Sequence, residues 1–140
     1  MSDAIRVAVC DDARAVKIFL RHVLEEEGDI EIVSSTSGGD DLLRDVSEHQ
    51  DATDHQDVSG QHIDVLLLDL VLPDVPEPAE LIARLRELSP QTAIVLISNL
   101  PEFRLAEEAQ RLGAEGWTTK AHKPGELRDV VRGVARRTRS

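Results

Sequence analysis

The chain has 140 residues, and 16 lysines and arginines against 27 aspartates and glutamates give it a formal net charge of −11 at pH 7. This length corresponds to about one domain, and the acidity argues against general binding of nucleic acid or an anionic membrane. A single cysteine, the lack of a long apolar run and the lack of a secretion-type leader argue against disulfide-stabilised, membrane-spanning and exported classes and favour a cytoplasmic protein.

The first part of the chain alternates short apolar segments with amphipathic ones. Residues 5–9 form a β-branched apolar run that predicts a buried strand. Residues 13–27 place apolar side chains at helical spacing, and Gly28 follows them, which predicts a helix with a glycine cap. Residues 30–34 predict a second strand, and residues 40–47 predict a weak helix.

The second part continues the alternation with stronger signals. Residues 63–68 are apolar on both faces, which is typical of a central parallel strand. The pattern then predicts helix, strand, helix, strand and helix over residues 78–88, 93–97, 101–112, 115–119 and 124–137. The polar residues 48–62 are expected to form a surface loop inserted before the third strand, and residues 138–140 a short tail.

Strands that alternate with helices predict one α/β domain over residues 1–140, with helices on both faces of a parallel sheet. In such sheets ligands bind outside the carboxyl ends of the strands, so the residues that follow each strand indicate the site. At these positions the sequence has Asp11, Asp12, Asp69, Ser98 and Lys120.

These residue types suit the chemistry of a phosphoryl group. Three carboxylates at one edge repel each other unless a hard cation joins them, and Mg²⁺ prefers oxygen ligands and leaves positions for phosphate oxygens. Asp69, on the central strand, is the best-placed nucleophile toward phosphorus, while Lys120 and Ser98 can contact phosphoryl oxygens. Taken singly, each residue also has a structural explanation as a helix cap, a turn residue or a surface charge.

The sequence resembles the receiver domain of bacterial two-component response regulators over essentially its whole length. Four segments carry the resemblance: residues 7–12 (VAVCDD), 64–73 (DVLLLDLVLP), 94–99 (IVLISN) and 113–120 (GAEGWTTK). The resemblance implies a flavodoxin-like, doubly wound, five-stranded parallel sheet of order 2-1-3-4-5, with five helices in a three-layer α/β/α arrangement.

The resemblance also implies roles for the acidic residues. Asp69 corresponds to the phosphoacceptor. Asp12 and Asp69 would bind Mg²⁺ directly and Asp11 would bind it through water, with the backbone carbonyl of Val71 as a further ligand.

The remaining roles concern the phosphoryl group and the signal. Ser98 and Lys120 correspond to the hydroxyl and the lysine that bind phosphoryl oxygens, and Trp117 to an aromatic residue that changes rotamer on activation. For Trp117, a partly buried aromatic at the sheet edge is the structural alternative. The implied function is a non-enzymatic switch that takes a phosphoryl group from a histidine kinase or phosphotransfer protein.

Further expectations concern the signalling partners of this switch. The signal would pass to a downstream effector protein, with no direct contact to nucleic acid or membrane, and the chain is expected to be a monomer or a weak homodimer. Because the chain ends soon after the last predicted helix, the output would lie in a separate protein or in the rest of a longer regulator.

Departures from the family pattern leave alternatives open. Ala121 follows Lys120 where proline is frequent, and the stretch after Pro73 lacks the usual glycine, which motivates a degenerate receiver that binds proteins independently of phosphorylation. A metal-dependent phosphatase would need a second carboxylate, for which Asp74 is poorly spaced. The arginines of the last helix form either a solvated face or a docking surface for an acidic partner: Arg128, Arg132, Arg136, Arg137 and Arg139.

Overall fold

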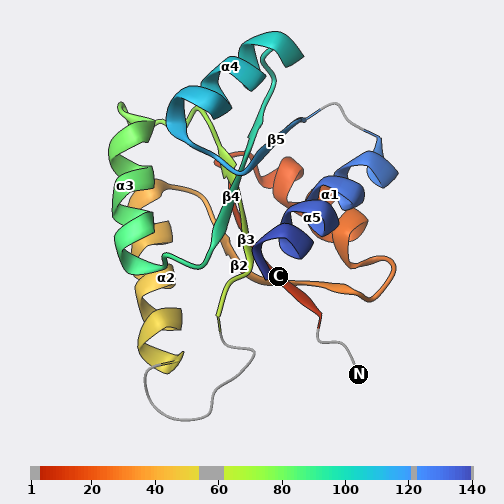
Figure 1. Cartoon of the computed structure of the whole chain (residues 1–140), viewed down its shortest axis with the longest axis horizontal. Coiled ribbons are helices and arrows are strands. Elements are labelled where there is room, and N and C mark those ends of the chain that lie inside the picture. The colour runs from red at the N-terminus through yellow and green to blue at the C-terminus, as the bar shows by residue number, and fades with distance from the viewer. Residues whose placement is uncertain (1–3, 54–61, 121–122, 140) are drawn as a thin grey trace.

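The computed structural model describes residues 4–53, 62–120 and 123–139, and it contains five strands that alternate with five helices (Figure 1). In chain order the elements are β1 (Ile5–Cys10), α1 (Arg14–Glu25), β2 (Ile30–Thr36), α2 (Gly39–Thr53), β3 (Val65–Asp69), α3 (Pro78–Leu88), β4 (Ala93–Ser98), α4 (Glu102–Leu112), β5 (Gly116–Thr119) and α5 (Pro124–Arg139). The predicted order of strands and helices is therefore confirmed.

The five strands form one sheet in the order β2-β1-β3-β4-β5, and every neighbouring pair is parallel. Helices α1 and α5 cover one face, and α2, α3 and α4 cover the other (Figure 1). This is the flavodoxin-like, three-layer arrangement that the resemblance implied. Because all strands run the same way, their carboxyl ends gather at one edge of the sheet.

Two apolar clusters, one on each face of the sheet, form the core. Leu67 and Val95 point into the cluster under α1 and α5, whereas Leu66 and Leu96 point into the cluster under α2, α3 and α4. All four side chains are almost completely buried. The central strands are apolar on both faces because both faces are covered.

The predicted and observed boundaries agree within two residues except at the end of α2, and α5 also extends beyond its predicted end. Helix α2 runs to Thr53, so the first six residues of the predicted 48–62 loop are helical; residues 54–61 lie outside the described residues. Buried Leu42 and Val46 hold the start of this helix on the sheet, and the polar residues that follow contain no proline or glycine before Gly60 to end it. Helix α5 likewise includes two residues of the predicted tail.

The connections follow the expected turn chemistry. Gly113 ends α4 in the left-handed conformation (φ 72°), and its N–H donates to the carbonyls of Ala109 and Gln110. Gly28 also has a positive φ, of 82°, after the end of α1. Within the described ranges, none of the helices combines the length and the apolar character needed to cross a bilayer.

Candidate functional site

Four of the five strands deliver a polar side chain to the carboxyl edge of the sheet. Asp11 and Asp12 follow β1, Asp69 is the last residue of β3, Ser98 is the last residue of β4, and Lys120 follows β5. Strand pairing places these ends in adjacent rows, since Asp69 pairs with Ile97, and Ser98 with Thr119. The sequence prediction that these residues share one edge therefore agrees with the observed register.

Three carboxylates converge at this edge. One oxygen from each of Asp11, Asp12 and Asp69 lies within 4.8 Å of the others. Asp11 is fully buried and Asp69 is 5% exposed, whereas Asp12 is open to solvent. This group can hold a hard cation on one side while leaving the other side open to a ligand.

Lys120 neutralises part of this negative charge. Its Nζ atom lies 2.7 Å from Oδ2 of Asp11 and 3.4 Å from Oδ2 of Asp69. The backbone N–H of Lys120 donates to the carbonyl of Ser98 at 2.9 Å, which extends the β4–β5 pairing by one residue. The ammonium group is thus held between the two buried carboxylates by the end of the sheet itself.

Local turns orient the two buried carboxylates. Oδ1 of Asp11 accepts a hydrogen bond from the N–H of Ala13 at 2.8 Å, and Oδ1 of Asp69 accepts one from the N–H of Val71 at 3.1 Å. These bonds leave Oδ2 of each aspartate directed at Lys120. Oδ2 of Asp11 is buried, and the Lys120 ammonium 2.7 Å away is its charged partner.

The environment shifts the protonation equilibria of the site. Burial raises the pKa of Asp69 to about 6, and the charge of Asp11 adds to the rise, while the Val71 N–H and Lys120 oppose it. Burial acts to lower the pKa of Lys120, but its contacts with Asp11 and Asp69 outweigh burial and raise this pKa. The carboxylates are therefore crowded and the lysine is firmly charged.

The remaining predicted site residues lie around this centre. Ser98 is buried, and its hydroxyl accepts a hydrogen bond from the N–H of Leu100 at 3.1 Å. Among the described residues its hydroxyl proton has no acceptor, so it can be donated to a bound group. Val71, two residues after Asp69, is 68% exposed. Trp117 is partly buried and packs against the cluster under α2, α3 and α4, as expected for an aromatic residue at the sheet edge.

Asp74 has a structural role that the sequence analysis missed. Its carboxylate accepts hydrogen bonds from the N–H groups of Gly39 at 3.1 Å and Asp40 at 3.4 Å, at the start of α2. The Gly39 N–H is the main cause of the lowered pKa of Asp74. Gly38 and Gly39, at the start of α2, have no side chain that could cap this helix, and this was the sequence signal for a cap from elsewhere in the chain.

Two arginines of α5 are engaged within the molecule. Arg128 lies 3.2 Å from Glu26, and Arg132 lies 2.6 Å from Glu27 and 2.7 Å from Asp29. The hydrogen bond from Arg132 is the main cause of the lowered pKa values of Glu27 and Asp29. These contacts connect α5 to the turn after α1. They argue against a role for Arg128 and Arg132 in an intermolecular docking surface.

Comparison with known proteins identifies the family. Residues 7–132 match the model of the response regulator receiver domain. The chain belongs to this family. Receiver domains in general are signalling modules rather than enzymes, bind Mg²⁺ at an acidic site, and interact with histidine kinases or phosphotransfer proteins and with effector domains.

Relatives of this receiver domain include longer proteins that contain a similar domain. The uncharacterized transcriptional regulatory protein YxjL of Bacillus subtilis (strain 168) is 27% identical over 134 residues, which are 96% of this chain and 56% of that protein. A protein-glutamate methylesterase/protein-glutamine glutaminase of Paramagnetospirillum magneticum is 26% identical over 95% of this chain and 31% of its own length. The chain thus spans only about a third to about half of these relatives.

Solved receiver domains share the architecture. The signal receiver domain of the putative response regulator NarL from Mycobacterium tuberculosis superposes with a TM-score of 0.77 at 25% identity, covering 96% of this chain and 98% of that chain. The CheY-like receiver domain protein from Methanospirillum hungatei superposes with a TM-score of 0.75 at 19% identity, covering 99% of this chain and 98% of that one. The receiver fold is therefore shown by the topology and by these superpositions.

Proposed function

We propose that residues 1–140 act as one phosphoacceptor receiver domain, in which Asp69 takes a phosphoryl group from the phosphohistidine of a histidine kinase or phosphotransfer protein. One observation carries this proposal: Asp11, Asp12 and Asp69 converge within 4.8 Å, with the Lys120 ammonium 3.4 Å from Asp69. Nucleophile, cation ligands and a counter-charge for the phosphoryl group are therefore present together.

The donor set fits Mg²⁺. Asp12 and Asp69 would bind the ion directly and Asp11 would bind it through water, with the backbone carbonyl of Val71 as a further ligand. Support comes from the oxygen-only character of the cluster, whose three carboxylates converge within 4.8 Å. When bound, Mg²⁺ neutralises charge on the phosphoryl oxygens.

The transfer itself requires an ionised Asp69. An Asp69 carboxylate oxygen forms a bond to phosphorus, while the bond from phosphorus to the donor imidazole nitrogen breaks, leaving its electron pair on that nitrogen. Lys120 binds one oxygen of the transferred group, and the Ser98 hydroxyl donates a hydrogen bond to another. The burial of Ser98 and the low side-chain exposure of Lys120 (14%) support these roles, because few water molecules compete there.

The donor would approach beside helix α1. A cavity of about 290 Å³ lies between α1 and the end of β5, and its lining includes Ala15, Phe19, Thr119 and Lys120. Phe19 is 43% exposed. An apolar side chain of the donor packed here would bring its phosphohistidine next to Lys120 and Asp69.

The output would use the face of α4, β5 and α5. Phosphorylation adds negative charge that Ser98 and Lys120 would contact. Ser98 ends β4, which pairs with β5, and Lys120 follows β5, which contains Trp117. Phe103 on α4 is 66% exposed and gives this face an apolar contact for a downstream effector protein. Reorientation of Trp117 would report the change, and its fluorescence offers a direct readout.

Treatment of the full chain with Mg²⁺ and acetyl phosphate tests the phosphoacceptor. Intact mass spectrometry should show the gain of one phosphoryl group by the wild type and none by Asp69→Asn. Asp74→Asn is the matched control, because this aspartate caps α2 and should leave labelling unchanged. Labelling that persists in Asp69→Asn, or wild type that takes no label, would refute the proposal.

The same experiment separates the alternatives. A degenerate receiver would take no label and would show no change in Trp117 fluorescence with beryllofluoride. A phosphatase would release phosphate catalytically from a small phosphomonoester. The position of Asp74 at the start of α2 disfavours it as the second carboxylate of a phosphatase.

A further inference from the structure

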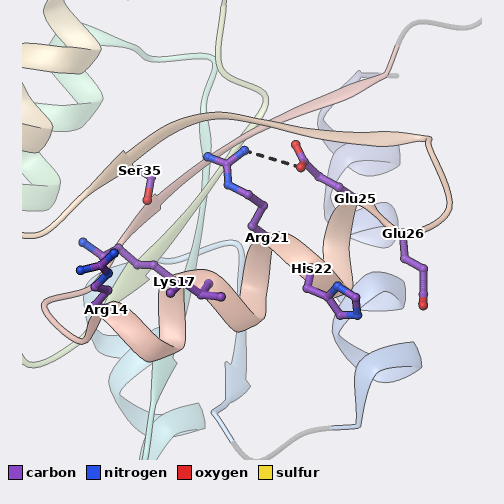
Figure 2. Close-up of a pocket in the computed structure, with 8 residues that line it drawn as sticks. Arg14, Lys17, Arg21, His22, Glu25, Glu26 and Ser35 are labelled. Atoms are coloured by element: carbon purple, nitrogen blue, oxygen red, sulfur yellow. Dashed lines mark ion pairs between the residues drawn. The ribbon is translucent and has the colours of Figure 1, made fainter.

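Helix α1 borders a second surface groove, on a different side of the helix from the cavity next to Lys120. A groove of about 580 Å³ lies along it, and Figure 2 shows its side chains spread along the helix, with Ser35 of β2 near one end. The lining residues are Arg14, Lys17, Ile18, Arg21, His22, Glu25, Glu26 and Ser35. This face shares no lining residue with the Lys120 cavity.

One end of the groove is basic, although the whole chain has a net charge of −11. Within the described ranges Arg14 has no ion pair, and Lys17 contacts the neutral hydroxyl of Ser37. Arg21 lies 3.5 Å from Glu25 but remains 52% exposed. These cations are therefore largely available to a partner.

Helix stability does not account for the basic end. Arg14 is the first residue of α1, and the first turn of this helix contains no acidic residue. The helix dipole disfavours cations at this end, so Arg14 and Lys17 stand where they weaken the helix slightly.

The groove changes character along its length. Ile18 lies one helical turn after Arg14 and is 60% exposed, which places an apolar surface beside the cations. Glu25 and Glu26 line the opposite end. Arg21 and His22 line the groove between Ile18 and these glutamates, so a basic end and an apolar residue are followed by a stretch of mixed charge.

We propose that this groove binds a segment of a partner protein whose acidic side chains lie over Arg14 and Lys17 and whose apolar side chain packs on Ile18. A nucleic acid or an anionic membrane carries one sign of charge throughout and would meet Glu25 and Glu26 as well as the acidic remainder of the surface. A protein segment can instead alternate its charges to match. This binding goes beyond the proposed phosphoryl transfer and does not require Asp69.

A titration of the ¹⁵N-labelled full chain tests the proposal. The probe is a short synthetic peptide with glutamates at one end, leucines in the middle and lysines at the other, and its counterpart is the same composition in shuffled order. Binding of the patterned peptide should shift amide signals of α1 and of Ser35, more strongly at low salt. The shuffled peptide should bind with an affinity at least several-fold lower, because its charges no longer lie opposite those of the groove.

Two matched double variants locate the binding. Arg14→Glu with Lys17→Glu should weaken the patterned peptide about tenfold or more. Arg84→Glu with Arg104→Glu makes the same charge change at exposed positions of α3 and α4 and should leave the affinity unchanged. Thermal unfolding checks that both variants remain folded.

Several outcomes would overturn this inference. They are the absence of binding, equal weakening by both double variants, equal binding of the shuffled peptide, and shifts confined to elements other than α1 and β2. If duplex DNA or anionic vesicles shift these amide signals and the peptide does not, the groove would be assigned to a polyanion instead. Asp69→Asn should bind the peptide like the wild type, and loss of binding there would also contradict the proposal.

Discussion

Replacement of Asp69 by asparagine should stabilise the metal-free protein at neutral pH, even though it removes the proposed phosphoacceptor. Burial and the neighbouring Asp11 raise the pKa of Asp69 from its ordinary 3.8 to about 6. An acid with a raised folded-state pKa binds its proton more tightly when folded, so its ionised form opposes folding. The uncharged amide removes this opposition.

The size of the effect follows from the pKa shift. A shift of about two units corresponds to about 3 kcal/mol of unfolding free energy once the pH is above 6. Solvent screening near exposed Asp12 and the lost ion pair with Lys120 reduce the gain, so about 3 kcal/mol is an upper value. The asparagine Oδ1 can still accept the hydrogen bond from Val71, which keeps the turn intact.

Urea unfolding of the two proteins in chelator measures this difference. The gain should be full above pH 6, decline as the pH falls from 6 toward 3.8, and vanish below 3.8, where Asp69 is protonated in both folded and unfolded states. Added Mg²⁺ should stabilise the wild type more than the variant. The control is Asp74→Asn, which should lose stability at neutral pH because the folded state lowers the pKa of Asp74.

Two results would refute this reasoning. One is a metal-free Asp69→Asn protein that is no more stable than the wild type at pH 7. The other is a stability difference that does not change with pH. Either result would mean that charge crowding at the sheet edge is already relieved without a metal ion.

Three further predictions concern stability and are measured by thermal unfolding. Gly39→Ala would place a methyl group 2.5 Å from a side-chain carbon of the loop after β3, and should cost about 1–3 kcal/mol. Gly133→Ala lies inside α5, where the added methyl group would meet the side chain of Arg137 at 4.0 Å, and should gain roughly 0.5–1 kcal/mol; equal effects of the two changes would contradict this packing. Arg132→Gln should lower Tm more at low salt than at high salt. That loss should fade as the pH falls through the lowered pKa values of Glu27 and Asp29, and a loss independent of salt and pH would point to packing instead.

The fold was largely readable from the sequence because its signals are local. A strand such as β3, whose Leu66 and Leu67 enter different clusters, must be covered on both faces and therefore has an apolar side chain at every position. Asp69 could be placed with Asp11 from sequence alone, since parallel strands end at a common edge. The site follows from topology more than from any single residue.

The features that the sequence analysis missed depend on contacts between distant segments. Asp74 caps a helix that begins thirty-five positions earlier, and only the folded chain brings them together. Arg132 meets Asp29 because α5 packs beside α1, at a separation of 103 residues. The end of α2 was also missed, because the residues after Val46 are mostly polar and show no helical spacing of apolar side chains.

The formal charges at the site explain why a divalent ion would bind before the phosphoryl group is transferred. Three ionised carboxylates and one ammonium group leave a formal charge of −2 at the sheet edge, which a divalent cation can neutralise. Phosphorylation replaces the single negative charge of Asp69 by about two, so the balance is lost again. Lys120, whose charge is already included in this balance, lies 2.7 Å from Asp11 and can move its charge toward the phosphoryl oxygens. A shift of Lys120 from Asp11 toward the phosphoryl group would therefore change the contacts where β5 ends and α1 begins.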